Sequence, residues 1–465
     1  MVIPEPVKQA LEQLERAGHE AFPVGGCVRD ALMGKQPSDW DIATAAEPGR
    51  VTEVFRDRRV IETGLKHGTV TVLIGGMPLE ITTYRVDGLY TDHRRPDGVT
   101  FTRSLTEDLA RRDFTVNAMA CHPQKGVIDP FGGRGDLERG ILRCVGEADK
   151  RFGEDPLRIL RGMRFMATYG FTAEAETDAS MRRNRELLRF ISAERIRVEL
   201  EKLLLGPFAR KVLLSYPEIL TFVIPELGPC VDFPQHNLWH DLDVYAHTLK
   251  TVECVPAEPA LRWAALFHDI AKPVCFFTDE KGERHFYGHA DAGADMAVKI
   301  MARLKFDNAT RDTVRNLVSC HMDYPEPAER SVNRAILRCG AEHFGEILLL
   351  QRADNLALTA DELSPRTEPL PLTEKMLSKR RDSFKKNEAV SRLFEEMQKK
   401  PHCFGTGELL IDGQSIMALG FGGADIGRAK EMLLWAVADG KVANETEALT
   451  AYLKKNGIRP DRRKK

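Results

Sequence analysis

Apolar residues in the first part of the chain follow two periods, one typical of a helix and one typical of strands. Val7, Leu11 and Leu14 have helical spacing, which predicts an amphipathic helix over residues 5–18. Short segments rich in apolar and β-branched residues then predict strands. These segments are Ala21–Val24, Asp39–Ala43, Thr69–Ile74 and Leu79–Tyr84. Glycine and proline in Gly75–Pro78 predict a turn between the last two strands.

From about residue 145 onward the pattern is almost entirely helical, with few β-branched runs. We therefore predict an α+β head, a small mixed sheet with helices, followed by all-α domains. A chain of 465 residues is too long for one core. Candidate boundaries are Gly146-Glu147, Pro217–Pro234 and Ser364–Thr373. The expected parts are a head at 1–145, a helical neck at 146–230, a third domain at 231–363 and a helical tail at 374–465.

The composition is typical of a soluble globular protein, with 43% hydrophobic and 29% charged residues. No apolar run approaches the length that spans a bilayer. The N-terminal residues lack a basic segment followed by an apolar one, so we expect no signal peptide. Nine cysteines are scattered without a Cys-x-x-Cys pair, which favours reduced thiols over disulfides or a zinc ribbon. We therefore expect a cytoplasmic protein without a membrane partner.

Positive charge is concentrated in two places, although the net charge is only −2. Six arginines crowd residues 182–197 against Glu186 and Glu194, and the chain ends Arg-Pro-Asp-Arg-Arg-Lys-Lys. A solvated charged face and a disordered tail explain each stretch as well as RNA contact does. Local basic surface on a nearly neutral protein also fits transient, salt-sensitive binding of an RNA.

One segment near the N-terminus carries the most specific chemistry. Asp39 and Asp41 are alternate residues of a predicted strand, so both carboxylates point to one face. Two carboxylates aimed at one point repel unless a cation lies between them, and oxygen ligands suit Mg²⁺. Gly25 and Gly26 let backbone N–H groups approach a polyphosphate, and Arg29 can add a positive fork. These are the parts of a metal-dependent nucleotidyl transfer site.

A third carboxylate follows on the last predicted strand. Glu80 alternates with Leu79 and Ile81, so it faces away from the core side of its strand. An ordinary solvent-facing residue would show the same pattern. A sheet that carries Asp39, Asp41 and Glu80 on one face would hold two Mg²⁺ ions, one to activate a 3′-hydroxyl and one to neutralise a triphosphate leaving group.

A later segment predicts recognition of a nucleotide base. Asp155 before Pro156 resembles a helix N-cap, but capping does not explain Arg158, Arg161 and Arg164, which are spaced by three residues. Cytosine and adenine each present an amino donor beside a ring-nitrogen acceptor, whereas uracil and guanine reverse that pattern. A carboxylate beside a guanidinium would accept C and A and reject U and G.

These motifs resemble those of the class II CCA-adding enzyme and poly(A) polymerase family. The family carries Gly-Gly-x-Val-Arg-Asp, Leu-x-Gly and Asp-x-Asp at the spacing found here, and Glu-x-Thr-Thr-x-Arg on the strand of Glu80. Leu-Ala-Arg-Arg-Asp-Phe-Thr-Val-Asn-Ala is similar to the family's ribose-binding motif. The resemblance implies that Arg112 contacts phosphate and that Asp113 and Asn117, on one helix face, bind ribose hydroxyls. It also implies that Glu-Asp-x-x-Arg acts as a protein template in place of a nucleic acid.

The resemblance is strong over residues 20–205 and looser over Ile411–Leu453. Gly64-Leu-Lys-His-Gly-Thr-Val-Thr-Val is closer to CCA-adding members than to bacterial poly(A) polymerases. The polar segment Gly88–Gly98 predicts a mobile loop. Family members use a loop there to reshape the site between C and A addition.

A second constellation lies in the third domain and resembles the HD superfamily of metal-dependent phosphohydrolases. Its six residues follow the order of that superfamily. They are His247, His268, Asp269, His289, His321 and Asp354. The resemblance implies one metal at His247, His268, Asp269 and Asp354, and a second at His289 and His321. Mixed imidazole and carboxylate ligands favour a divalent transition metal, Mn, Fe, Ni or Zn, over Mg²⁺.

Our leading hypothesis is a nucleotidyltransferase that adds C, C and A to tRNA 3′ ends from CTP and ATP. A poly(A) polymerase, or an enzyme that adds only CC or only A, is a second reading within the same class. A reading from a different class is an RNA 3′-end phosphohydrolase in which the HD site dominates and the head docks RNA. The sequence does not decide the oligomeric state.

Overall fold

The computed structural model describes residues 2–62, 64–65, 68–88, 98–236, 240–280, 282, 284–364 and 374–457. The chain divides into two compact units, Met1–Val223 and Ile224–Lys465. Among the described residues, no helix has both the length and the apolar character needed to cross a membrane. The division after Val223 falls within the proline-rich stretch Pro217–Pro234, and the finer division into four parts remains a prediction.

The first unit contains a five-stranded mixed sheet of order β1-β2-β5-β4-β3. Its strands are β1 (Ala21–Pro23), β2 (Asp41–Thr44), β3 (Arg59–Ile61), β4 (Thr69–Ile74) and β5 (Met77–Thr83). Strands β2 and β5 run parallel, and every other neighbouring pair is antiparallel. The parallel register sets Asp41 directly opposite Glu80.

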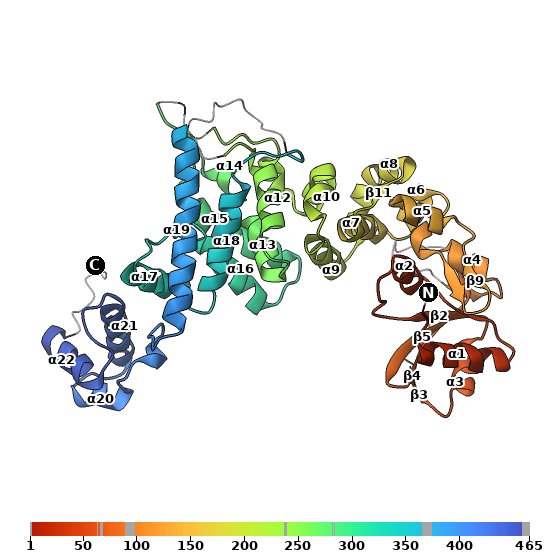
Figure 1. Cartoon of the computed structure of the whole chain (residues 1–465), viewed down its shortest axis with the longest axis horizontal. Coiled ribbons are helices and arrows are strands. Elements are labelled where there is room, and N and C mark those ends of the chain that lie inside the picture. Colours follow the sequence, from red (N-terminus) through yellow and green to blue (C-terminus); the bar gives the residue numbers. More distant parts are fainter. Residues whose placement is uncertain are drawn as a thin grey trace. The chain divides into compact units, whose positions relative to one another are not determined.

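Helices α1 (Glu5–Arg16) and α3 (Pro48–Val54) pack on this sheet (Figure 1). Val7, Leu11 and Leu14 of α1 are buried, so the predicted amphipathic face is confirmed. The helix ends at Arg16, two residues before the predicted limit, because Gly18 takes φ +84° and turns the chain toward β1.

The four predicted strands correspond to β1, β2, β4 and β5 but differ at their ends. The ladder of β2 begins at Asp41, and Asp39 precedes it. Strand β5 begins at Met77, so the turn is reduced to Gly75 and Gly76, which have φ +57° and +80°. The pattern did not predict β3 or the two-stranded pairs of the first unit. Those pairs are β6 (Arg85–Asp87) with β7 (Val99–Phe101), β8 (Ala120–His122) with β9 (Gly126–Ile128), and β10 (Ile141–Leu142) with β11 (Thr172–Ala173).

Short helices complete the first unit. They are α2 (Gly26–Leu32), α4 (Leu105–Ala110), α5 (Gly133–Arg139), α6 (Ala148–Glu154), α7 (Leu157–Tyr169), α8 (Ala175–Arg183), α9 (Ala193–Leu204), α10 (Ala209–Ser215) and α11 (Pro217–Val223), with 3₁₀ turns η2 (Thr115–Asn117) and η3 (Arg185–Phe190). Helix α7 packs on α9 and α10 through a face that includes Leu160, Met163 and Ala167. The helix begins just after Pro156 and ends at Gly170, which takes φ +76°.

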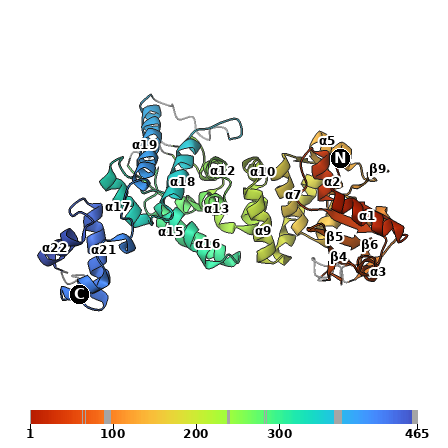
Figure 2. The ribbon, with the colours of Figure 1, turned by 60° about the horizontal axis from the view of Figure 1, so that its bottom comes forward.

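Where the structure describes it, the second unit is helical apart from one short hairpin, β12 (Phe277–Thr278) with β13 (Arg284–His285). Its helices are α12 (Val244–Cys254), α13 (Pro259–Phe267), α14 (Lys272–Cys275), α15 (His289–Arg303), α16 (Asn308–Cys320), α17 (Glu329–Cys339), α18 (Phe344–Ala357), α19 (Glu374–Gln398), α20 (Gly413–Ala418), α21 (Ala424–Ala438) and α22 (Thr446–Asn456), with 3₁₀ turns η4 (Pro225–Cys230) and η5 (Thr406–Glu408). Figures 1 and 2 show α12, α13, α16 and α18 side by side, with α19 along α18. Trp263 and Phe267 of α13 are buried. The last three helices close over their own apolar cluster, which includes Ile416, Leu433 and Leu449.

Four predicted features lie wholly or partly outside the described residues. The mobile loop predicted at Gly88–Gly98 falls mainly on residues 89–97, and the Gly-Leu-Lys-His-Gly motif includes residues 66 and 67. The basic terminus falls on residues 458–465, and the predicted boundary Ser364–Thr373 falls mainly on 365–373.

Candidate nucleotidyl transfer and metal sites

Two carboxylates share one face of the head sheet, and the charge of a third acts on one of them. Asp41 and Glu80 are paired residues of parallel strands, so their side chains lie on the same face. Asp39 is exposed just before β2, and Trp40 between the two aspartates is buried on the opposite side. Burial raises the pKa of Asp41, and the charges of Glu80 and Asp39 raise it further. This local excess of negative charge, made only of oxygen donors, fits a hard divalent cation such as Mg²⁺.

Gly25 admits a guanidinium to this face. It takes φ +78°, and a Cβ built on it would lie 2.6 Å from Arg112 Nη1. The charge of Arg112 lowers the pKa of Asp41, which places this guanidinium beside the carboxylates. The N–H of Gly25 donates to the carbonyl of Met119 at 3.1 Å. The N–H of Gly25 is therefore already bonded, and the expected approach of other backbone N–H groups to a polyphosphate at Gly25 and Gly26 stays a prediction.

Arg29 is buried and already has partners. Its Nη1 donates to Asn117 Oδ1 at 2.5 Å, its Nη2 donates to the Tyr169 hydroxyl at 2.8 Å, and its Nε donates to Asp30 Oδ1 at 2.9 Å. The guanidinium also lies 4.7 Å from the centre of the Tyr169 ring. We expected Arg29 to add a fixed positive fork at the phosphates. These contacts fix its guanidinium and position Asn117, and the contact with phosphate stays a prediction.

Asp113 and Asn117 are brought together, but not by an α-helix as we predicted. Phe114 between them is extended in a bridge with Cys144, and only the 3₁₀ turn η2 follows. Asn117 Nδ2 still donates to Asp113 Oδ1 at 3.0 Å. Arg161 binds Asp113 Oδ2 with two N–H groups, at 3.0 and 2.7 Å. Burial alone would raise the pKa of Asp113, but Arg161 and Asn117 hold it below its ordinary value, so the carboxyl stays ionised.

Asp155 and Arg158 lie where α6 gives way to α7, and each has a different partner. Asp155 Oδ2 accepts from Arg195 Nη2 at 2.9 Å, and its Oδ1 accepts from the N–H of Leu157 at 3.2 Å. Arg158 Nη1 donates to Glu154 Oε2 at 2.8 Å. The expected carboxylate–guanidinium pair is thus divided between two ion pairs. Sequence spacing offered no signal for Arg195, which is forty residues away in α9.

Arg164, Arg182 and Arg183, which we assigned to nucleotides or RNA, are also paired with carboxylates. Arg164 Nε donates to buried Glu199 at 2.6 Å, and its guanidinium lies over the Phe165 ring. In the basic stretch 182–197, Arg182 pairs with Asp178 and Arg183 pairs with Asp149, at 3.1 and 2.8 Å. Much of the positive charge predicted for RNA contact is therefore neutralised within the unit.

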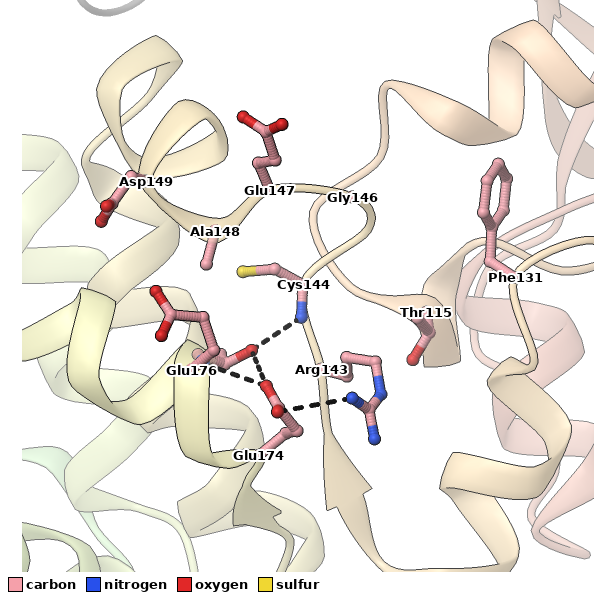
Figure 3. A pocket seen from close by; sticks show the side chains of 11 residues that line it. Thr115, Phe131, Arg143, Cys144, Gly146, Glu147, Ala148, Asp149, Glu174 and Glu176 are labelled. Carbon is pink, nitrogen blue, oxygen red and sulfur yellow. Dashed lines mark hydrogen bonds and ion pairs between the residues drawn. The ribbon is translucent and has the colours of Figure 1, made fainter.

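A cavity of about 500 Å³ opens elsewhere in the first unit, beside the starts of α6 and α8 (Figure 3). Its lining includes the carboxylates of Glu147, Asp149, Glu174 and Glu176 and the guanidinium of Arg143. Arg143 is paired with Glu174 at 3.5 Å. None of the predicted site residues lines this cavity. An excess of carboxylates disfavours a triphosphate, so we do not assign the nucleotide there.

In the second unit all six residues of the HD pattern converge. Asp269 lies at the centre. Its Oδ2 lies 3.1 Å from His268 Nε2 and 3.4 Å from His247 Nε2, and its Oδ1 lies 3.3 Å from His289 Nε2 and 3.9 Å from His321 Nε2. Asp354 Oδ1 closes the first group, 3.0 Å from His247 Nε2. Asp269 therefore bridges two groups of donors, as a pair of metals would require.

The four histidines are oriented for ligation. Each presents Nε2 to the cluster while Nδ1 faces a backbone carbonyl, a pattern that fixes the ring and its tautomer in metal sites. The four Nδ1···O distances are 3.3 Å for His247 to Ala357, 2.8 Å for His268 to Ala265, 2.6 Å for His289 to Phe286, and 2.7 Å for His321 to Val318. Burial lowers the pKa of His321 to about 3, so this imidazole is neutral and able to bind a metal. The chemistry of this donor set fits a divalent metal.

Two residues beside the cluster were missed in the sequence. His240 can join His247 and Asp354 as a third group of ligand atoms within 4.8 Å. Lys272 Nζ lies 2.7 Å from Asp269 Oδ2 and 3.4 Å from His240 Nε2. Lys272 stands three residues after Asp269 in one helical turn, a spacing that could have suggested it. His240 precedes α12, so no helical period connects it to His247.

The cluster opens into a cavity of about 1330 Å³ in the second unit. Asp269, His289 and Asp354 lie in its wall together with the basic side chains of Lys272, Arg284, Arg338, Lys379 and Lys386. The candidate metal site is thus reached from solvent through a cavity whose wall includes basic side chains.

Three family models match the chain in succession. The model described as Poly A polymerase head domain matches residues 21–143, which include Asp39, Asp41 and Glu80. The model described as Probable RNA and SrmB- binding site of polymerase A matches 170–230, and the HD domain model matches 244–364.

Known proteins resemble the chain at both partial and full length. A CCA-adding enzyme of Geobacillus thermodenitrificans is 51% identical over 45% of this chain and 52% of its own, so that match spans about half of the relative. The structure of the Bacillus stearothermophilus CCA-adding enzyme in complex with CTP shares 29% identity and a TM-score of 0.70 over 97% of this chain and 98% of that one. The CCA-adding enzyme of Lactobacillus delbrueckii subsp. bulgaricus is 34% identical over 95% of this chain and 96% of its own. Identity at this level over nearly the whole of both proteins means that the chain belongs to the family of CCA-adding enzymes.

Proposed function

We propose that the protein adds C, C and A to the 3′ ends of tRNA from CTP and ATP, without a nucleic-acid template. The observation that carries the proposal is the pairing of Asp41 with Glu80 on one face of the sheet, where the charges of Asp39 and Arg112 also act on Asp41. Membership of the CCA-adding family supports it, as does the CTP complex of the Bacillus stearothermophilus relative.

Asp39, Asp41 and Glu80 would hold Mg²⁺, which would activate the tRNA 3′-hydroxyl and neutralise the triphosphate leaving group. Arg112 faces these carboxylates past Gly25 and would bind a phosphate oxygen. Asp113 would accept and Asn117 would donate hydrogen bonds with ribose hydroxyls. Arg161 holds Asp113 in place, and Arg29 holds Asn117. The division of roles is therefore between carboxylates for metal, Arg112 for phosphate and the Asp113–Asn117 pair for sugar.

Base selection would require two ion pairs to exchange partners. In the structure Arg195 neutralises Asp155, and Glu154 neutralises Arg158. A cytosine or adenine edge would replace Arg195 at the carboxylate and Glu154 at the guanidinium. The resting pairs avoid leaving buried charges without partners when no nucleotide is bound. Uracil and guanine could not complete the exchange because their donors and acceptors are reversed.

Incubation of the purified protein with Mg²⁺, tRNA that lacks its CCA end, and each nucleoside triphosphate in turn tests the proposal. CTP alone should give two additions, CTP with ATP should give three, and UTP and GTP should give none. A poly(A) polymerase would extend a run of A from ATP alone, and partial enzymes would stop after CC or add only A. No incorporation with any mixture would refute the proposal.

We also propose that the HD unit binds a divalent transition metal and hydrolyses a phosphoester at an RNA 3′ end, such as a 2′,3′-cyclic phosphate. Water would add to phosphorus, one P–O bond to ribose would break, and a proton from water would complete the released hydroxyl. The bridging position of Asp269 between two histidine pairs supports this proposal. Metal analysis of the purified protein tests it first. Absence of bound metal together with no cleavage of model cyclic phosphates would leave the unit without this function.

A cytoplasmic location is part of the proposal. All nine cysteines are free, and five of them are buried. Free thiols are typical of reducing compartments. Fractionation of cells that produce the protein, with detection by antibody, would test the location.

A further inference from the structure

Three aromatic rings, here called the aromatic cluster, gather on the hairpin β12–β13 and on Tyr287, two residues after it. The planes of Phe277 and His285 lie at 28° with ring centres 5.1 Å apart, and those of His285 and Tyr287 lie at 7° with centres 5.7 Å apart. The planes of Phe277 and Tyr287 lie at 34° with centres 5.6 Å apart, so the three ring centres form a triangle. His285 Nε2 lies 3.0 Å from Asp279 Oδ2, which fixes the plane of the imidazole. The aromatic cluster is therefore a set of rings that pack on one another rather than a group of independent side chains.

The aromatic cluster is exposed to solvent. Tyr287 is 74% exposed and Phe277 is 47% exposed, although large apolar rings usually contribute to a core. Exposed aromatic rings that pack on one another are typical of surfaces that bind other π systems. A nucleobase is such a system, and single-stranded bases bind proteins mainly by stacking on aromatic side chains.

Two members of the aromatic cluster line the same cavity as the metal ligands. His285 and Tyr287 line the cavity of about 1330 Å³ together with Asp269, His289 and Asp354. Tyr287 stands two residues before His289, and the intervening chain is fixed because His289 Nδ1 lies 2.6 Å from the carbonyl of Phe286. A ligand that stacks on Tyr287 can thus reach the metal ligands with its next group of atoms.

The charge of the cavity suits a phosphate only when metal is present. Five Lys and Arg side chains and five Asp side chains line it, so the wall alone is nearly neutral. Divalent cations at Asp269 and Asp354 would make the metal end positive, while the aromatic end remains apolar. A ligand with a flat base at one end and a phosphoester at the other matches both ends.

We propose that Tyr287 and His285 form a base-stacking platform that selects nucleotides as substrates of the HD site. This rests on the proposed phosphohydrolase function and specifies it further. The ligand is a nucleotide with an unpaired base and a phosphoester on its ribose, either free or at the 3′ end of a single strand. The base stacks on the platform while the phosphoester lies at the metal ligands.

The platform is tested with two substrates that differ only in the base. One is adenosine 2′,3′-cyclic phosphate, and the other is the base-free 1-O-methylribose 2,3-cyclic phosphate. Tyr287→Ala should lower kcat/KM for the adenosine substrate about fivefold to a hundredfold, mainly through KM, since stacking contributes about that much per base. Tyr287→Ala should leave hydrolysis of the base-free substrate unchanged, and Tyr287→Phe should behave as the unaltered protein. Val274→Ala, at an exposed apolar position in α14 outside the cavity lining, is the matched control.

Equal effects of Tyr287→Ala on both substrates, or no effect on either, would overturn the platform. If the unaltered protein hydrolyses neither substrate, the phosphohydrolase function fails and binding still tests the platform. In that case adenosine 3′-monophosphate is titrated by calorimetry into the unaltered protein and into Tyr287→Ala. Weaker binding by the variant supports the platform, and equal binding refutes it. A short RNA that ends in a cyclic phosphate, compared with the free nucleotide, shows which source has the lower KM.

Discussion

At the scale of single residues, the two adjacent glycines of the head motif have different tasks. Gly25 has a positive φ and leaves room for Arg112, whereas the nearest atom to a Cβ on Gly26 is 3.6 Å away. Only Gly25 therefore needs to be glycine for steric reasons. Arg112 approaches the carboxylates through the space that a side chain would fill.

Gly25→Ala should lower nucleotide addition by about a hundredfold because it displaces Arg112 and strains the backbone. Gly26→Ala is the matched control and should retain most activity, since its contact is of ordinary van der Waals length. Initial rates with tRNA lacking CCA measure both, and circular dichroism checks the fold. Similar activity of the two variants would contradict this role of Gly25.

Asp155 and Arg158, which we propose select the base, should affect nucleotide choice differently from Arg195, the present partner of Asp155. Arg158→Ala and Asp155→Ala should each reduce discrimination against UTP and GTP at least tenfold, because each leaves one edge of C and A without a partner. Arg195→Ala should keep the discrimination, since Arg195 only neutralises Asp155 before the base binds. Competition between CTP and UTP measures the ratio of kcat/KM. Loss of selectivity in Arg195→Ala alone would show that the template had been assigned to the wrong arginine.

At the scale of elements, an ion pair joins helix α7 to the segment that we propose binds the ribose. Arg161 of α7 grips Asp113 with two hydrogen bonds, and Asp113 also accepts from Asn117. The helix therefore supports the Asp113–Asn117 pair as well as carrying Arg158. This contact crosses forty-eight residues of sequence.

Asp113→Asn should destabilise the first unit by roughly 1.5–3 kcal/mol at pH 7, which is the usual effect of losing hydrogen bonds to a charged group. The pKa of Asp113 is lowered in the folded protein, so its stabilisation is present above the unfolded pKa of about 3.9 and is lost as the pH falls below that value. The difference in unfolding free energy between the two proteins should therefore shrink below about pH 4. Urea unfolding from pH 3 to 7 measures it, and a difference independent of pH would contradict the assignment.

At the scale of the whole molecule, the carboxylate face and the HD cluster belong to different compact units, Met1–Val223 and Ile224–Lys465. Each cluster is built from residues of one unit only. We therefore expect the two activities to be separable by substitution.

His268→Ala combined with Asp269→Ala should abolish retained metal and phosphoester cleavage while CCA addition stays within about twofold. Asp39→Ala combined with Asp41→Ala should do the opposite, and tRNA binding should persist because these aspartates are proposed to hold metal rather than RNA. Metal analysis and the two activity assays on the same preparations measure which function each double variant loses. Loss of both activities in either double variant, with the fold intact, would show that the sites are coupled.

The sequence by itself determined the features that depend on local spacing. Period and turn residues were sufficient for α1, for four strands of the head sheet and for the placement of Asp41 and Glu80 on outward-facing strand positions. Motifs were sufficient to identify the family and the six HD residues, because ligand types and their order are written along the chain. The expected helix through Asp113 and Asn117 failed because the bridge of Phe114 with Cys144 overrides local propensity.

Tertiary structure alone decided which charged groups face one another. Arg195 on Asp155, Arg161 on Asp113 and Arg29 on Asn117 each join segments at least forty residues apart. Likewise, two rings of the aromatic cluster and the metal ligands share one cavity only because the folded hairpin places Tyr287 near the metal ligands. Sequence periodicity reports which face of an element is buried, whereas pairing across elements depends on how whole helices and strands pack. That packing is a collective property of the core, which no local pattern encodes.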